Sequence, residues 1–212
     1  MDTRTSSHAA EHPPERRKPR RGAGILLLAA LILIGGIWLQ DALTYDGPRE
    51  AVFPLPLQEA EYTNDWGAPR PQGPHEGTDI YAPEGTPIYA ITGGTVTGSG
   101  WNTLGGYTVM VRAAYGIGPV ERGDLLYYAH LREPSPLEPG DEVVAGQKIG
   151  EAGRTAGEEE GTVAGFPPHL HLGWYEGFSL FGESRAQAES GAMNPYPLLR
   201  WIESGGGRVT PE

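Results

Sequence analysis

The sequence predicts a mainly β fold in which antiparallel strands form a sheet or sandwich, preceded by one transmembrane helix. Glycine and proline are abundant, with 32 and 20 residues in a chain of 212, which argues against a helical bundle and for short strands joined by turns. From about residue 65 to 201, β-prone runs alternate with Gly-rich turns and leave little room for crossover helices. The runs are TPIYAITGGTVTGSG (86–100), YTVMVRAA (107–114), DLLYYAHL (124–131), DEVVAGQKIGEAG (141–153) and HLHLGWY (169–175).

The charge and the cysteine content restrict the possible functions. Residues 41–212 hold ten Lys and Arg against twenty-four Asp and Glu, and the whole chain has a net charge of −11. This acidic balance argues against a nucleic-acid partner, because nucleic-acid binding requires a basic surface. With no cysteine in the chain, any transition-metal site has to use histidine and carboxylate ligands.

The N-terminal part predicts a membrane anchor. Residues 1–22 carry a basic cluster from Arg16 to Arg21 and almost nothing apolar, so we expect a cytoplasmic tail. Residues 23–39, AGILLLAALILIGGIWL, contain neither charge nor proline, and a helix of this length spans about 26 Å, at the short end for a bilayer. Trp38 lies near the outer end, where an interfacial aromatic residue is expected.

Residues 23–39 have two other interpretations. A cleaved signal peptide would have a shorter apolar core and a small-x-small cleavage site; the run ends GIWLQD, a poor site, although Ala42 leaves cleavage open. A buried core helix would not normally be apolar all round and flanked by five basic residues. We therefore expect an anchor, a linker at 40–64, a folded domain at 65–202 and a flexible tail at 203–212.

The histidines point to a metal site. Apart from His8 and His12 in the N-terminal tail, they occur in three short segments: PHEGTD with His75, YYAHL with His130, and PPHLHL with His169 and His171. A solvated or core histidine has no reason to be confined in this way.

The spacing within the segments favours shared ligation. His75 and Asp79 are four residues apart, so the period of two places both on one face of a strand entered through a turn. His169 and His171 share a face for the same reason. One of that pair would complete a three-ligand His₂Asp set, which leaves a fourth position for water, as in a catalytic zinc site. Each pattern is weak alone, and their combination on predicted strands is strong.

In this combination the chain resembles the lysostaphin-type M23 metallopeptidases, the zinc endopeptidases of peptidoglycan. The similar text covers roughly residues 66–200. It comprises HEGTDIYAPEGTPIYA (75–90), GGTV near Gly93, GGY near Gly105, YAHL (128–131), PGDEVVAGQKIG (139–150) and HLHL (169–172).

The resemblance implies a site and a fold, while the apolar run and the basic cluster at the N-terminus imply the location. It implies that His75, Asp79 and His171 bind Zn²⁺ and that His130 and His169 are catalytic histidines beside the metal. It also implies a metallopeptidase domain whose site lies in a groove floored by sheet and walled by loops. The expected substrate is peptidoglycan peptide, cleaved by a zinc-activated water outside the bacterial plasma membrane, with the anchor in that membrane.

The sequence departs from the family pattern at two places, both beside the expected site. Residues 154–168, RTAGEEEGTVAGFPP, form a longer and more acidic segment than the usual short turn. After HLHL, Gly173 stands where the family often has an acidic residue, and an insertion at about 177–192 precedes Asn194. These differences put the choice of substrate in doubt, and leave the metal site intact.

Two other functions are alternatives to a peptidase. A catalytically inactive family member could act as an extracellular scaffold or activator of another wall enzyme, but such relatives typically lose one or more ligands. A biotinyl or lipoyl carrier is suggested by PGDEVVAGQKIGEAG, yet Lys148 is expected to enter a strand instead of occupying a hairpin tip. The carrier hypothesis also leaves four histidines unexplained.

The predicted anchor can be tested by the membrane topology of the chain. A protease added to intact spheroplasts should degrade residues 41–212, because the positive-inside rule places the N-terminus in the cytoplasm. Immunoblotting against tags at both ends measures this. Full protection of the C-terminal part, or a mature form starting near residue 43, would contradict the anchor.

Overall fold

The computed structural model describes residues 45–178 and 184–209. The chain divides into two compact units, Met1–Ile37 and Trp38–Glu212, and the first lies outside the described residues. The predicted cytoplasmic tail and the predicted helix at 23–39 therefore lie outside them too. Within the described ranges, no helix is both long enough and apolar enough to cross a membrane.

The prediction of a mainly β, antiparallel fold is confirmed. Twelve strands are present in the described part of the chain, and every pairing between them is antiparallel. The strands are β1 (Glu61–Tyr62), β2 (Pro69–Arg70), β3 (Gly73–Pro74), β4 (Thr78–Tyr81), β5 (Pro87–Tyr89), β6 (Gly94–Asn102), β7 (Gly106–Ala113), β8 (Leu125–Leu131), β9 (Glu142–Val143), β10 (Lys148–Glu151), β11 (His169–Tyr175) and β12 (Ala192–Met193).

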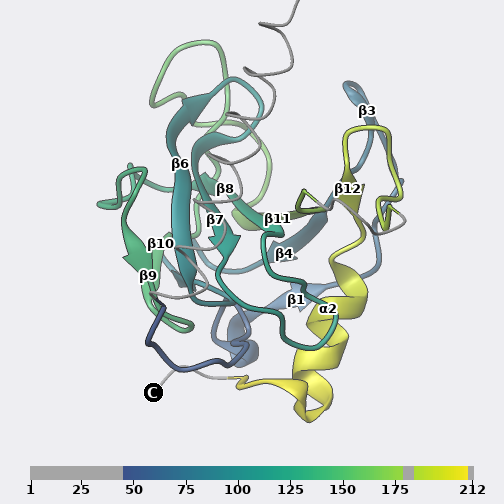
Figure 1. Cartoon of the computed structure of the whole chain (residues 1–212). Helices are drawn as coiled ribbons and strands as arrows, with labels where there is room; N and C mark the ends of the chain where they lie inside the picture. Colours follow the sequence, from purple (N-terminus) through teal and green to yellow (C-terminus); the bar gives the residue numbers. More distant parts are fainter. Residues whose placement is uncertain (1–44, 179–183, 210–212) are drawn as a thin grey trace, which may run out of the picture. The chain divides into compact units, whose positions relative to one another are not determined.

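One large sheet dominates the domain (Figure 1). Its strand order is β1-β4-β11-β8-β7-β6-β9, and β12 pairs with the C-terminal end of β11. The pairs β5–β10 and β2–β3 form two small separate sheets. The strands β6 and β7 have nine and eight residues, and their register shifts between Val96 and Gly98 of β6. Glycine in a strand marks such a bulge or bend.

Three short helical segments complete the domain: η1 (Leu57–Glu59), α2 (Tyr196–Trp201) and η2 (Ile202–Gly206). The expected short helix after Asn194 is present as α2, with Pro195 at its start. Leu198, Leu199 and Ile202 belong to the buried core, so the helical end of the chain packs against the sheet.

Alternation along the central strands separates a core face from an open face. In β11, Leu170, Leu172 and Trp174 are part of the core cluster, whereas His169 and His171 point to the other side and line a groove. The core is completed by Ile88 of β5 and Ile149 of β10. The sheet is thus apolar where it meets the core and polar where it faces the groove, as expected for antiparallel sheet.

The described part of the expected linker belongs to the folded domain. Residues 51–53 and Leu55 are fully buried, and β1 pairs with β4. Part of the expected flexible tail is also packed, since the backbone of Arg208 bonds to Ala51 and Phe53. Residues 51–55 and the backbone of Arg208 thus pack within the described domain, although their sequence suggested a linker and a tail. Phe53 and Leu55, which flank Pro54, are the large apolar side chains that this segment buries.

This packing predicts a large effect on stability. Replacing Phe53 by Ala should lower the free energy of unfolding by about 3–5 kcal/mol, the usual cost of removing a buried aromatic ring. Phe53 is fully buried and its ring centroid lies 5.7 Å from that of Tyr62. The exposed control Val163→Ala should change the free energy by less than about 0.5 kcal/mol. Urea denaturation measures both, and a loss below about 1 kcal/mol for Phe53→Ala would mean that residues 51–62 do not support the core.

Candidate metal centre

The register between β4 and β11 brings two of the three predicted ligands, Asp79 and His171, together. Asp79 stands directly opposite His171, and their side chains lie on the same face of the sheet. The Nδ1 atom of His171 is 3.1 Å from the Oδ1 atom of Asp79. Because residues directly opposite in an antiparallel pair have close Cβ atoms, this register alone makes the two groups neighbours.

His75 reaches the same point from the loop between β3 and β4. Its Nε2 atom lies 2.9 Å from Nδ1 of His171 and 3.1 Å from Oδ1 of Asp79. The turn at Gly77 allows this approach: a Cβ atom at Gly77 would lie 2.4 Å from the ring of His171. The three predicted ligands therefore converge although His75 is outside the strand.

The donor set fits a metal ion. His75, Asp79 and His171 each offer one ligand atom, and these atoms lie within 4.8 Å of one another. Their separations of 2.9, 3.1 and 3.1 Å are close to the roughly 3.3 Å expected between ligands bound tetrahedrally at about 2.0 Å. Two imidazoles and one carboxylate are the ligand chemistry of a zinc site that keeps one position open.

The electrostatics of the cluster favour a positive charge between these groups. Burial lowers the pKa of His75, but hydrogen bonds to Asp65 and Asp79 outweigh it and raise that pKa to about 9. Burial raises the pKa of Asp79, and hydrogen bonds from His171 and His75 bring it well below its usual range. A carboxylate that stays ionised while buried attracts either a proton on a neighbouring ring or a metal cation.

His169 and His130 lie beside the cluster in the same groove. The Nε2 atom of His169 is 3.6 Å from Oδ1 of Asp79, and the ring centroids of His130 and His169 are 4.8 Å apart. Burial lowers the pKa of both rings, and repulsion between the protonated forms of His130 and His169 helps to lower the pKa of His130 to about 4. Both shifts favour the neutral imidazole.

Backbone carbonyls fix the tautomer of both neutral rings. The Nδ1 atom of His130 lies 2.9 Å from the carbonyl oxygen of Thr155, and Nδ1 of His169 lies 2.8 Å from that of Pro167. A carbonyl oxygen can only accept, so Nδ1 carries the proton in each ring. The Nε2 atom of each ring then has a lone pair available to accept a proton.

A bulge in β8 turns His130 toward the groove. Leu126 and Tyr128 face the core, so simple alternation would bury His130 with them. Between Tyr128 and Leu131, however, β8 holds one residue more than the opposing part of β7. His130 has a φ of 61°, the one positive value at a non-glycine residue in the described part of the chain. Bulges next to active sites often redirect a side chain in this way.

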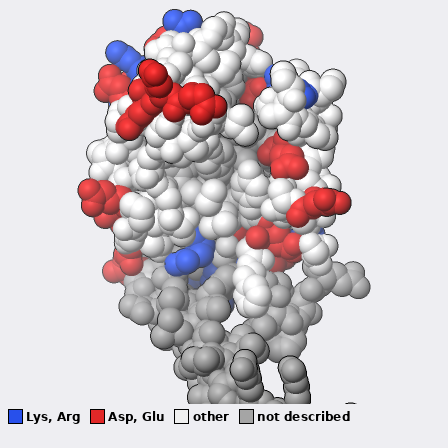
Figure 2. Space-filling view, turned by 90° about the horizontal axis from the view of Figure 1, so that it is seen from above, with Lys and Arg blue, Asp and Glu red and all other residues white. Residues whose placement is uncertain are grey.

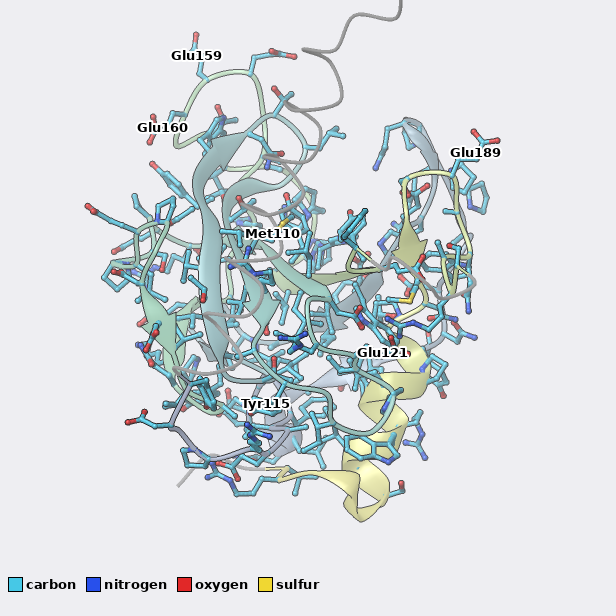
Figure 3. All side chains as sticks on the ribbon, in the orientation of Figure 1. Met110, Tyr115, Glu121, Glu159, Glu160 and Glu189 are labelled. Carbon is cyan, nitrogen blue, oxygen red and sulfur yellow. The ribbon has the colours of Figure 1, made fainter. Side chains whose placement is uncertain are left out.

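The long segment 154–168 supports both catalytic candidates. Thr155 and Pro167 accept the two Nδ1 protons, and the ring of Phe166 lies 4.8 Å from His130 and 5.0 Å from His169 between centroids. Its acidic middle, Glu158 to Glu160, is exposed. In Figure 3, Glu159 and Glu160 stand at the outer end of this loop, away from the sheet. The sequence identified the loop as unusual but did not predict these contacts.

The insertion after β11 contacts the groove through Glu76, one of the lining residues. Ser190 donates a hydrogen bond of 2.6 Å to Glu76, which is adjacent to His75. Arg185 is held by the fully buried Asp124 through a contact of 2.6 Å. Glu189 of this insertion stands at the outer edge of the molecule in Figure 3. Acidic side chains outnumber basic ones among the described residues seen from above in Figure 2.

All five predicted residues line one groove of about 680 Å³. Further walls come from residues whose roles the sequence did not reveal: Arg70, Tyr81, Leu104, Tyr127, Phe166 and Tyr175. The expected groove, floored by sheet and walled by loops, is therefore present.

Comparisons with known proteins identify the family. Residues 73–185, more than half of the chain, match the model of peptidase family M23. The chain therefore belongs to peptidase family M23. It is 35% identical over 156 residues to an L-Ala–D-Glu endopeptidase of Bacillus subtilis and 32% identical over 143 residues to lysostaphin of Staphylococcus simulans. These matches cover 71% and 66% of this chain, but only 43% and 24% of the two relatives.

A solved structure supports the same fold. A crystal structure from Ruminococcus gnavus, described as a candidate glycyl-glycine endopeptidase LytM, aligns with a TM-score of 0.59 and 32% identity. The alignment covers 92% of this chain and 76% of that one. The fold of the described domain is thus that of the M23 peptidases.

The geometry predicts how metal retention depends on Asp79. Asp79→Ala should abolish zinc binding, because the carboxylate is one of three converging ligands and the remaining pair is a much poorer site. Zinc content after dialysis, measured by atomic emission on the full chain in detergent, tests this. The control Asp141→Ala removes an exposed carboxylate and should keep one zinc. Unchanged stoichiometry and affinity in Asp79→Ala would show that the ligands are misidentified.

Proposed function

We propose that this chain is a zinc-dependent endopeptidase that hydrolyses peptide bonds of bacterial peptidoglycan. One observation carries the proposal: three candidate ligand atoms separated by 2.9–3.1 Å lie in the same groove as the imidazole rings of His130 and His169. One relative is named a peptidoglycan DD-endopeptidase, and another is named an L-Ala–D-Glu endopeptidase. That name makes the L-Ala–D-Glu bond the first substrate to test.

The metal would be held by Nε2 of His75, Oδ1 of Asp79 and Nδ1 of His171, the atoms that face one another. When bound, Zn²⁺ supplies Lewis-acid polarisation of the scissile carbonyl and lowers the pKa of a water molecule toward neutrality. The other steps belong to the side chains of the protein.

His130 and His169 supply proton transfer in this proposal. Each ring donates its Nδ1 proton to a backbone carbonyl, so Nε2 is the atom that takes the proton from the attacking water. The same Nε2–H then protonates the leaving amine. A ring that holds this proton can also donate a hydrogen bond to the developing oxyanion, which a neutral ring of this tautomer cannot do. Because both rings have the same tautomer, we assign proton transfer and oxyanion stabilisation to the two rings together.

We further propose that the domain works outside the bacterial plasma membrane, anchored by residues 23–39 with the N-terminus in the cytoplasm. This placement rests on the apolar run and the basic cluster before it, and it would bring the groove to its substrate.

Separate variants of the two histidines distinguish an enzyme from a scaffold. His130→Ala and His169→Ala should each retain zinc, yet lower the turnover rate by roughly 10²–10⁴, the usual size of one acid–base or oxyanion contribution. Mass spectrometry of defined muropeptides measures turnover, with zinc content and melting temperature determined on each variant. Full activity in either zinc-loaded variant would refute the proposed roles. A zinc-loaded wild type that cleaves no muropeptide would favour the scaffold alternative.

A further inference from the structure

Two charged residues lie directly behind the proposed metal ligands. Asp65 precedes β2, and Arg70 is the last residue of β2. One nitrogen of Arg70, Nη2, lies 3.2 Å from Oδ2 of Asp65 and 2.8 Å from Oδ2 of Asp79. Oδ2 of Asp65 lies 3.0 Å from Nδ1 of His75. A continuous chain of hydrogen bonds therefore joins two of the three proposed ligands from behind.

Asp65 determines which nitrogen of His75 faces the cluster. The Nδ1 atom has two oxygens of Asp65 as neighbours, the carboxylate at 3.0 Å and the backbone carbonyl at 3.3 Å. Both oxygens accept, so Nδ1 keeps its proton and Nε2 is the nitrogen that would offer its lone pair to a metal ion beside Asp79 and His171. Backbone hydrogen bonds between Gly67, Ala68 and His75 hold the two segments together.

Arg70 divides the two oxygens of Asp79 between different tasks. Oδ2 accepts the hydrogen bond from Arg70, whereas Oδ1 faces the rings of His75 and His171. A carboxylate with one oxygen occupied in this way cannot easily rotate to offer both oxygens to a metal. Arg70 thereby favours binding through one oxygen, which suits a four-coordinate site with an open position.

A purely structural ion pair is the competing explanation. Arg70 would then only tie the β2–β3 hairpin to the sheet, and its side chain is about one-third exposed, where ion pairs contribute little stability. The two explanations differ in what they predict. If the Arg70 ion pair only stabilises the hairpin, its removal lowers the melting temperature alone. If it orients the ligand atoms, its removal changes metal affinity and coordination.

We propose that Asp65 and Arg70 are positioning residues that orient His75 and Asp79 for the metal. The proposal rests on the metal site put forward under Proposed function. Both residues precede residue 73, where the family match begins, so residues before the matched region complete the site. Hydrogen-bond partners of metal ligands commonly contribute in this way.

The test measures zinc affinity in the full chain purified in detergent. Asp65→Ala and Arg70→Met should each weaken zinc binding by about 10–100-fold, the usual effect of removing such partners. Competition with a chelating dye measures the dissociation constant without relying on activity. The double variant should lose less than the product of the single effects, because both residues act through one network.

Conservative variants and spectroscopy separate positioning from stability. Arg70→Lys keeps the charge and one donor and should recover part of the affinity lost in Arg70→Met. Asp65→Asn keeps the shape and one acceptor, and serves if Asp65→Ala fails to fold. In Co²⁺-substituted protein, Arg70→Met should alter the visible absorption spectrum, which depends on coordination number and ligand geometry.

A matched control removes a similar ion pair elsewhere. Arg208 contacts Glu50 through two hydrogen bonds of 3.0 and 2.8 Å, with side chains about as exposed as that of Arg70. Arg208→Gln should leave the zinc dissociation constant and the Co²⁺ spectrum unchanged.

Three outcomes would overturn the proposal. One is a zinc dissociation constant within about twofold of wild type in both Asp65→Ala and Arg70→Met, with the Co²⁺ spectrum unaltered. Another is an equal loss of affinity in Arg208→Gln, which would indicate general destabilisation. The third is a wild-type chain that binds no zinc, which would remove the metal site itself. A chain that binds zinc and cleaves no muropeptide would refute the peptidase proposal alone, because affinity and spectrum still test the positioning.

Discussion

The antiparallel register of β4 against β11 is the constraint on which the candidate site depends. It places Asp79 opposite His171, and on the opposite face of the same strands it buries Ile80, Leu170 and Leu172 in the core. A slip of one residue would exchange these faces, burying the polar groups and exposing the apolar ones. The hydrophobic core and the candidate metal cluster therefore require the same register.

Around this rigid pair, loops supply the remaining groups. His75 comes from the loop before β4, while the segment 154–168 holds the rings of His130 and His169 through backbone carbonyls. Backbone carbonyls suit this purpose because they accept hydrogen bonds without adding charge to a buried site. The rings can thus remain neutral beside a cluster that attracts positive charge. The segment 154–168 differs in sequence from the family pattern, yet its backbone carbonyls contact both rings.

The N-terminal part of the domain links stability to the site. Phe53 and Leu55 are buried in the core, and the chain then runs through β1 to Asp65 behind His75. The same stretch that covers the core therefore delivers a hydrogen-bond partner to a proposed ligand. Its sequence, interrupted by Pro54 and Pro56, resembles a linker because it has no regular periodicity. Burial came from tertiary packing of a few apolar side chains, which local pattern does not reveal.

The sequence by itself determined the β class, the open face of β11 and the identity of the clustered histidines and Asp79, because a period of two and short spacings act within single segments. Only the tertiary structure decided the rest. Alternation would have buried His130 beside Tyr128, and a bulge with a positive φ turned it outward. Asp65 and Arg70 carry no recognisable spacing to the ligands they touch, since their contacts depend on how a hairpin folds back on the sheet. Interactions between segments are set by packing and register, which no single segment encodes.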